Sequence, residues 1–165
     1  MVLMMNRFEI DDLSVVNWPS LSLSVTINSF SQLNSIPSIV TNIRFRNGVG
    51  NDLNYVNSSS FTRFLLLKRI EIGNDCFQNV REFVINGLPN LERVKVGEKC
   101  FHIGDEEQKN GSGSIENCPK LESLITKSYS FKDFKEFTLS KVNSLKYIDF
   151  GENSFMFANC ILNGK

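Results

Sequence analysis

The fold of this chain is decided by the stretch Phe77-QNVREFVINGLPNLERVKVGEKC-Phe101. It contains two copies of one half-motif, apolar-x-x-apolar-x-apolar, which run from Val80 to Ile85 and from Leu91 to Val96. The last three residues of each copy place apolar side chains two positions apart, which is the period of a β-strand with one buried face. The stretch therefore predicts two short strands.

The second half of this stretch recurs along the chain. The segments 64–77, 88–101, 118–131 and 142–155 align with almost no adjustment, and their closing phenylalanines are spaced 24, 30 and 24 residues apart. Self-similarity at such a period indicates a solenoid, in which each repeat buries its apolar side against the next. The closing phenylalanines are expected to be buried at a shared corner and to stack along the solenoid axis: Phe77, Phe101, Phe131 and Phe155.

Weaker copies of the half-motif precede the clear repeats, at 5–10 and 40–45. Alternating apolar residues from Leu21 to Ile27 predict one more strand, and residues 48–52 are interpreted as a small inserted turn. All copies together predict one solenoid domain over residues 1–165. This domain is mostly β, with about 24 residues per coil, little helix, and parallel strands about 4.8 Å apart.

Residue types at the corners and ends refine this picture. Gly73, Gly97 and Gly151 each follow a strand at one repeat position, where the tolerance of glycine for positive φ suits a corner. The repeat pattern breaks off at both ends of the sequence, which would leave strand edges open. The chain is therefore expected to be a piece of a longer repeat array, or to associate with itself edge to edge.

The Leu-x-x-Ile-x-Ile pattern of residues 67–72 resembles the strand signature of leucine-rich repeats, L-x-x-L-x-L. The fuller pattern, with Ile-Gly-x-x-Cys/Ser-Phe after the strand, resembles the BspA-like (treponemal-type) subfamily over about residues 40–160. Phenylalanine often replaces leucine here, and Cys or Ser replaces the alanine that usually precedes the closing phenylalanine. The resemblance implies a right-handed solenoid that binds proteins or cell surfaces, and it implies no enzymatic activity.

Composition indicates a globular protein without a preference for polyanions. Hydrophobic residues make up 41% of the chain and charged residues 22%, and 18 basic residues balance 18 acidic ones, so nothing favours nucleic acid as a partner. The apolar run 1–5 is too short for a signal peptide, and no run approaches the roughly 20 apolar residues of a membrane span. The chain as given is therefore expected to be cytoplasmic, without membrane insertion, unless an upstream signal is missing.

No arrangement of residues indicates catalysis, a cofactor or a metal site. His102 is the only histidine, no G-x-S-x-G is present, and no cysteines have zinc-ligand spacing. Cys76 and Cys100 share one repeat position with Ser130 and Ser154, which indicates a small residue packed beneath the corner. The redox state of the two cysteines is left open, because adjacent coils would bring them within disulfide distance.

The segment 102–117 is predicted to be an inserted loop, because Phe101 and Cys118 are 17 positions apart where the template has 11. It is acidic at 105–107 and rich in glycine and serine at 110–114. The two interpretations are a loop that binds a cation or a partner, and a solvated excursion from a corner. The second is favoured, because adjacent carboxylates do not have the spacing of a calcium loop.

The outward positions of the strands form the candidate binding surface. Stacking in register predicts columns of solvent-facing side chains, with opposite charges adjacent at Lys68–Glu92, Glu71–Lys95 and Glu122–Lys146. Apolar and aromatic groups on such a charged face are typical of interface hot spots, and two occur here. The candidate partner-binding residues are Arg69, Glu71, Arg93, Lys95, Ser123, Ile125, Tyr147 and Asp149.

The function predicted from these features is a non-catalytic leucine-rich-repeat module that binds a protein partner of unknown identity through one strand face. The alternative is a fragment of an extracellular adhesin or surface antigen, which the family resemblance allows. An upstream signal peptide in the parent gene would favour the alternative.

Overall fold

The structure, a computed structural model, describes residues 22–103 and 110–163. Within these residues the chain is mostly β: its strands form two parallel sheets, and its only helices are two short 3₁₀ segments, η3 (Phe30–Asn34) and η4 (Ser58–Ser60). The predicted parallel strands and low helix content are confirmed. The half-motif at 5–10 lies outside the described residues.

The described strands divide into sheet A, with six strands, and sheet B, with five. Sheet A has the spatial order β1 (Ser24–Ile27), β2 (Asn42–Phe45), β4 (Arg69–Ile72), β6 (Arg93–Val96), β8 (Ser123–Thr126) and β10 (Tyr147–Phe150). Sheet B has the order β11 (Asn159–Asn163), β9 (Phe134–Ser140), β7 (Gly111–Glu116), β5 (Glu82–Asn86) and β3 (Tyr55–Val56).

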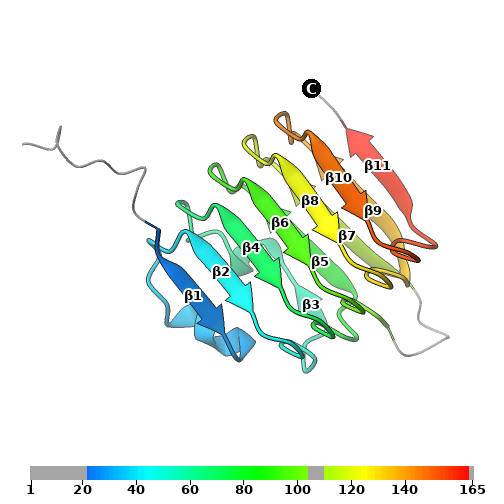
Figure 1. Cartoon of the computed structure of the whole chain (residues 1–165), viewed down its shortest axis with the longest axis horizontal. Coiled ribbons are helices and arrows are strands. Elements are labelled where there is room, and N and C mark those ends of the chain that lie inside the picture. The colour runs from blue at the N-terminus through cyan, green and yellow to red at the C-terminus, as the bar shows by residue number, and fades with distance from the viewer. Residues whose placement is uncertain (1–21, 104–109, 164–165) are drawn as a thin grey trace, which may run out of the picture.

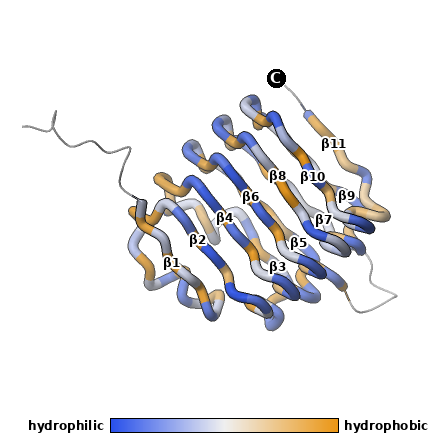
Figure 2. Tube along the Cα trace, in the orientation of Figure 1, coloured by the Kyte–Doolittle hydropathy of each residue, from blue (hydrophilic) through white to orange (hydrophobic). Residues whose placement is uncertain are grey.

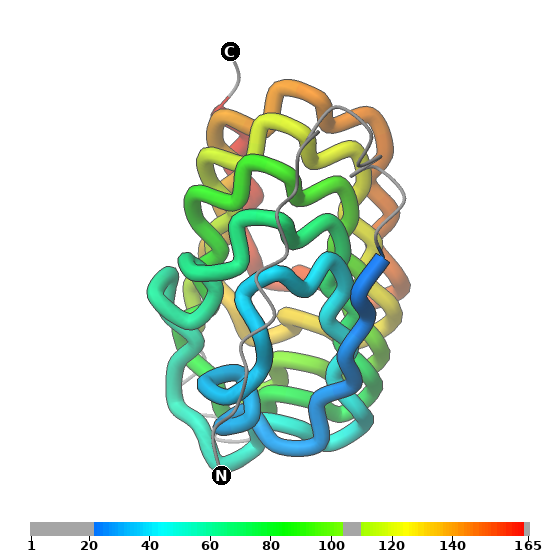
Figure 3. Tube along the Cα trace, turned by 90° about the vertical axis from the view of Figure 1, so that its left-hand side faces the viewer, coloured from blue at the N-terminus to red at the C-terminus, as the bar shows by residue number. Residues whose placement is uncertain are grey.

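From β2 onwards the chain passes alternately through the two sheets, so that each strand of sheet A is followed by one of sheet B (Figure 1). We call one passage through sheet A and then sheet B a circuit. Figure 3 shows the tube running around successive circuits, stacked from the blue end to the red end. Neighbouring strands within a sheet, such as β4 and β6, are therefore equivalent positions of successive circuits.

The core lies between the two sheets and is filled by the inward residues of the half-motifs. In β4, Ile70 and Ile72 are buried, whereas Arg69 and Glu71 lie on the outer face. The same alternation of apolar and polar positions is visible along the strands in Figure 2. Burial of each large apolar side chain contributes about 1.5–3 kcal/mol, which offsets the entropy lost in ordering such short strands.

A column of stacked phenylalanine rings runs through this core from circuit to circuit. The ring centroids of Phe77 and Phe101 are 5.1 Å apart, those of Phe101 and Phe131 4.3 Å, and those of Phe131 and Phe155 4.8 Å. The interplanar angles are 13°, 8° and 8°, and all four residues are buried. The prediction that these phenylalanines are buried and stack on one another is therefore confirmed.

The corner after each of β4, β6, β8 and β10 has the same backbone conformation. The closing phenylalanines have φ between 52° and 56°, and the residues two positions earlier have φ between 54° and 62°. The left-handed region costs a residue with a side chain about 1–2 kcal/mol. Burial of the ring offsets this cost, as does a backbone hydrogen bond to the preceding circuit, such as Phe101 N–H to Cys76 O at 3.1 Å.

The corner glycines are required by the close approach of a neighbouring backbone, and not by their own backbone conformation. None of Gly73, Gly97 and Gly151 has a positive φ, so that prediction is wrong. Each lies where the chain approaches the backbone of the preceding circuit: a Cβ at Gly97 would lie 2.5 Å from the carbonyl oxygen of Gly73. Glycine is needed here because a side chain would push the circuits apart.

Residues 48–52 are not an inserted turn, because they belong to an equivalent corner in the preceding circuit. The register of β2 with β4 places Gly48 and Gly50 at the positions of Asp75 and Phe77. Both glycines have positive φ, 76° and 81°. A Cβ at Gly50 would lie 2.3 Å from the ring of Phe77, so this ring occupies the space of the missing side chain.

The small residues before the closing phenylalanines pack beneath the corner, as predicted, and they also donate hydrogen bonds across it. Each thiol or hydroxyl donates to a carbonyl of the preceding circuit: Cys76 to Arg46 (3.0 Å), Cys100 to Gly73 (2.9 Å), Ser130 to Gly97 (2.5 Å) and Ser154 to Lys127 (2.7 Å). Cysteine and serine interchange at this position because both are small donors. Both cysteines are free thiols.

The segment 102–117, predicted to be an inserted loop, contains the strand β7, which pairs with β5 and β9. The register places Gly113 opposite both Phe83 and Phe137. A Cβ at Gly113 would lie 2.7 Å from the ring of Phe137, so the neighbouring ring fills this part of the core. The apolar pattern did not predict this strand, because glycine occupies the position at which β5 and β9 have phenylalanine. The acidic residues 105–107 lie outside the described residues.

Candidate functional site

The outer face of sheet A carries the candidate residues that the sequence analysis singled out. Strand register arranges the outward side chains in two columns that cross the strands. The first column is Ser24, Asn42, Arg69, Arg93, Ser123 and Tyr147, and the second is Thr26, Arg44, Glu71, Lys95, Ile125 and Asp149. The predicted columns therefore agree with the register, and all eight candidate positions lie on this one face.

Burial separates one candidate from the others. Ser123 is only 9% exposed, because its short side chain lies in register between the long side chains of Arg93 and Tyr147. Ser123 therefore offers a partner little surface, although it lies at its predicted position in the column. Tyr147 is 52% exposed, and its hydroxyl donates a hydrogen bond to Asp149 Oδ2 at 3.4 Å.

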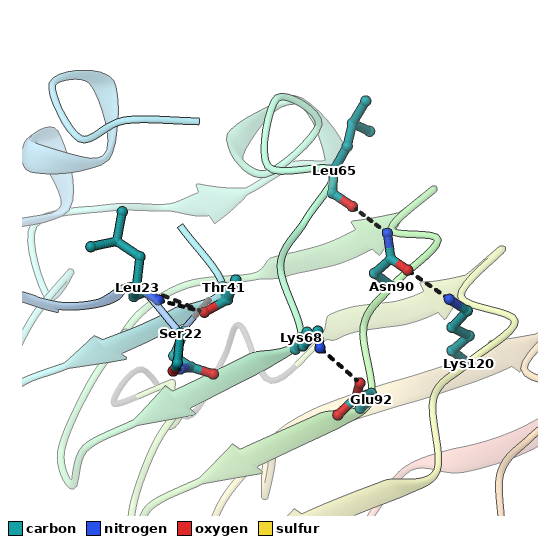
Figure 4. Close-up of polar contacts among 9 residues, drawn as sticks. Ser22, Leu23, Thr41, Leu65, Lys68, Asn90, Glu92 and Lys120 are labelled. Atoms are coloured by element: carbon teal, nitrogen blue, oxygen red, sulfur yellow. Dashed lines mark hydrogen bonds and ion pairs between the residues drawn. The ribbon is translucent and has the colours of Figure 1, made fainter. Parts of the chain in front are cut away.

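Polar contacts connect successive circuits along the border of this face (Figure 4). Lys68 Nζ lies 3.9 Å from Glu92 Oε1, which confirms this predicted pair. On the neighbouring turns, Asn90 donates a hydrogen bond to the carbonyl of Leu65 at 2.9 Å and accepts one from Lys120 at 2.7 Å. These contacts are exposed, so each contributes at most about 1 kcal/mol. They connect successive circuits at the border and leave the outer face of sheet A accessible.

The other predicted ion pairs have different outcomes. Lys146 Nζ lies 3.1 Å from Glu122 Oε1, as expected. Glu71 does not pair with Lys95; its Oε2 lies 3.9 Å from Nε of Arg44 on the other side. Arg44 on β2 and Lys95 on β6 are both register neighbours of Glu71, and β2 was not included in the predicted columns.

Two arginines lie side by side at the centre of the basic part of the face. Arg69 and Arg93 are register partners on β4 and β6, and both are exposed. In the described part of the chain, no carboxylate lies within ion-pair distance of either guanidinium or of Lys95. Like charges in cross-strand pairs destabilise a sheet by up to about 1 kcal/mol. An anionic partner group would relieve this repulsion.

Two recesses lie at the end of this face formed by β1, β2 and β4. The first has a volume of about 300 Å³, and its lining includes Arg44, Arg69 and Glu71. The second, of about 480 Å³, is lined in part by Arg44 and Arg46. Thr26 and Arg44 line both recesses, so the two form one hollowed region across β1, β2 and β4.

The outer face of sheet B has a different distribution of charge. Its in-register outward positions from β5 to β11 are Glu82, Val84, Asn86, Ser112, Ser114, Glu116, Glu136, Thr138, Ser140, Asn159, Ile161 and Asn163. These positions of the described strands include three carboxylates and no lysine or arginine. Exposed Arg81, directly before β5, and exposed Lys135 on β9 lie beside these positions, so sheet B carries both signs of charge and lacks the row of cations found on sheet A.

The C-terminal end of the described structure exposes residues of the core-facing type. Ile148 is 41% exposed although its register partner Leu124 is buried, and Leu162 is 64% exposed although its partner Leu139 is buried. A recess of about 410 Å³ lies between them, with Leu145 in its lining. An open strand edge beside apolar side chains is a site where a further strand can add.

Three buried thiols lie away from these surfaces. The adjacent Cys76 thiol and burial raise the pKa of Cys100, and the adjacent Cys100 thiol lowers the pKa of Cys76. Burial raises the pKa of Cys118. All three are free thiols within the core, so their contribution here is to packing and hydrogen bonding.

A buried carboxylate anchors the start of the 102–117 segment. Asp133 Oδ2 lies 3.2 Å from Nδ1 of His102 and accepts a hydrogen bond from the backbone N–H of Ile103 at 3.1 Å. Asp133 is 1% exposed. Asp133 follows Lys132 in the sequence, and nothing in the repeat pattern marked it as buried.

Comparisons with family models, curated proteins and solved structures found no match. Within residues 22–103 and 110–163, no helix is long and apolar enough to cross a membrane. The same residues contain no group of three histidine, cysteine or acidic side chains placed to hold a metal ion.

Proposed function

We propose that this chain is a non-catalytic leucine-rich-repeat solenoid of the BspA-like type that binds a protein partner through the outer face of sheet A. The observation that carries the proposal is the arrangement of this face. Exposed Arg69, Arg93 and Tyr147 occupy one register column of this sheet. Arginine and tyrosine, together with tryptophan, are enriched among interface hot spots.

The solenoid assignment is supported by the course of the backbone. Alternation between two parallel sheets, the ring column and the recurring corner are what a repeat of 24 to 30 residues needs to stack on itself. The residues 67–72 and 91–96, which resemble the leucine-rich-repeat signature, include the sheet A strands β4 and β6. The proposal assigns no catalytic residue, cofactor or metal.

A second binding mode follows from the open C-terminal edges. We propose that the 165-residue chain associates with a second copy of itself through β10 and β11. The exposure of Ile148 and Leu162 supports this mode, because pairing along these edges would bury both side chains.

The face assignment can be tested by site-specific photo-crosslinking in an extract of the cells that produce the protein. A benzophenone amino acid at Tyr147 on sheet A is compared with one at Thr138 on sheet B, and both variants must keep the wild-type circular dichroism spectrum. Discrete protein adducts at position 147 and none at 138 are expected. Equal labelling at both positions, or labelling only at 138, would contradict the proposed face.

A further inference from the structure

We infer that the outer face of sheet A binds an extended acidic segment of a protein, with the acidic residues over β2, β4 and β6 and an apolar residue over β8 and β10. This inference rests on the proposed function and specifies the chemistry of the partner. It follows from the uneven distribution of charge and apolar groups along the face.

The charge is concentrated at one end of the two columns. The outward positions of β2, β4 and β6 hold four cations, Arg44, Arg69, Arg93 and Lys95, against the single carboxylate of Glu71, so their net charge is 4 − 1 = +3. Glu71 is already paired with Arg44. The remaining three cations have no ion pair among the described residues.

The positions of the cations favour individual carboxylate groups as ligands. Arg69 and Arg93 are register neighbours on adjacent strands, so their guanidinium groups can engage one carboxylate or two successive ones. The hollowed region beside Arg44 and Arg69 offers room for acidic side chains next to these donors. Carboxylates bound here would remove the like-charge repulsion that the unbound face carries.

The other end of the face has a different chemistry. Beyond β6 the outward positions are Ser123, which is buried, the half-buried Ile125 on β8, and the exposed Tyr147 and Asp149 on β10. Ile125 and Tyr147 suit an apolar side chain, and Asp149 disfavours a further acidic one. The partner segment is therefore acidic at one end and apolar at the other.

The strand spacing sets the length of this segment. Four steps of about 4.8 Å separate β2 from β10 in sheet A, which gives a span of roughly 19 Å. An extended chain covers this distance with about six residues at roughly 3.3 Å each. Sheet B has no such row of cations, and its in-register outward positions carry Glu82, Glu116 and Glu136, so it disfavours the same segment.

The test is fluorescence anisotropy with the whole 165-residue chain and short labelled peptides. The probe is a fluorescein-labelled run of glutamates ending in leucine and phenylalanine, and its matched control replaces the glutamates with glutamines. The variant R69Q/R93Q is compared with R81Q/K135Q, which removes the same charge from exposed residues at sheet B. Thermal melts establish that both variants keep the wild-type fold.

The acidic peptide is expected to bind the wild type, and R69Q/R93Q to weaken its Kd about tenfold or more. R81Q/K135Q should change the Kd less than about twofold. Tyr147→Ala should weaken only the peptide that ends in leucine and phenylalanine, and leave an all-glutamate peptide unaffected. The glutamine peptide should bind at least about tenfold more weakly than the acidic one.

Three outcomes would overturn the inference. The acidic peptide fails to bind, both double variants weaken it equally, or a single-stranded oligouridylate binds more tightly than the peptide and depends on Arg69 and Arg93. The last result would assign the face to nucleic acid. The two proposals can be separated. If crosslinking gives adducts at position 147 but the acidic peptide does not bind, the acidic partner is rejected and the proposal that sheet A binds a protein is retained.

Discussion

The rings of Phe101 and Phe131 stack with their centroids 4.3 Å apart and their planes at 8°. The two residues belong to successive circuits and occupy the same corner position with the same φ of 55°. This contact is the centre of a column that continues to Phe77 and Phe155. The column aligns each circuit with the next through contacts in the core. The ion pairs at the surface add to this alignment.

Truncation of a ring in the middle of this column should be costly. Phe101→Ala removes a fully buried side chain that contacts rings on both sides, and is expected to lower the free energy of unfolding by about 3–5 kcal/mol. Urea denaturation measures the change, with Phe101→Leu as a control that loses less. An unchanged midpoint for Phe101→Ala would show that the column does not hold the circuits together.

Adding one methyl group at Gly113 should disturb the packing of β9 against β7. A Cβ there would lie 2.7 Å from the ring of Phe137, so Gly113→Ala is expected to destabilise the protein by about 1–3 kcal/mol. Ser112→Ala, on the exposed side of the same strand, should change stability by less than about 0.5 kcal/mol. Equal melting temperatures for the two variants would contradict the close approach of this ring.

The corner hydroxyl of Ser130 should be replaceable by another small donor but not by a methyl group. Its Oγ is buried and donates to the carbonyl of Gly97 at 2.5 Å, so Ser130→Ala is expected to cost about 1–3 kcal/mol. Ser130→Cys should lose less, because Cys100 makes the equivalent bond to Gly73 in the preceding circuit. Chemical denaturation of the three proteins side by side provides the comparison, and an alanine variant as stable as wild type would refute this role.

Self-association should depend on the C-terminal edges. The 165-residue chain is expected to form dimers or larger species at high concentration, and I148K/L162K to remain monomeric, because lysines at these positions cannot be buried. Leu65→Lys, at a residue that is 55% exposed elsewhere on the surface, should not prevent association. Multi-angle light scattering distinguishes these species, and a strictly monomeric wild type would exclude association through β10 and β11.

The repeat pattern predicted the fold where apolar residues mark the strands. The half-motifs predicted strands at β4, β6 and β10, and the spacing of the phenylalanines predicted the ring column. The pattern failed at β7, because Gly113 leaves its share of the core to Phe137, a neighbour that is distant in sequence. When a neighbouring ring fills the space beside a glycine, that position adds no apolar residue to the repeat pattern.

The corner glycines show the same limitation. The sequence correctly identified Gly97 as a position that requires glycine, but the reason lies in the carbonyl of Gly73, which only stacking brings close. Positive φ occurs instead at residues with side chains, such as Lys99 and Phe101, where sequence rules do not expect it.

The candidate site was predicted in part. Register columns follow from the repeat period alone, so the positions of Arg69, Arg93 and Tyr147 were accessible from sequence. The burial of Ser123 depends on the length of its neighbours, and the pairing of Glu71 with Arg44 depends on a strand in a weaker copy. Extending the columns back to the half-motif 40–45 would have found Arg44.

Amide chemical-shift mapping decides whether the outer face of sheet A is the binding surface. The glutamate peptide ending in leucine and phenylalanine is titrated into isotopically labelled protein, and backbone shifts are followed on both sheets. Shifts are expected in β2, β4, β6, β8 and β10, centred on Arg69 and Arg93, with β5, β7 and β9 unaffected. Shifts confined to sheet B, or spread evenly over the two sheets, would contradict this assignment.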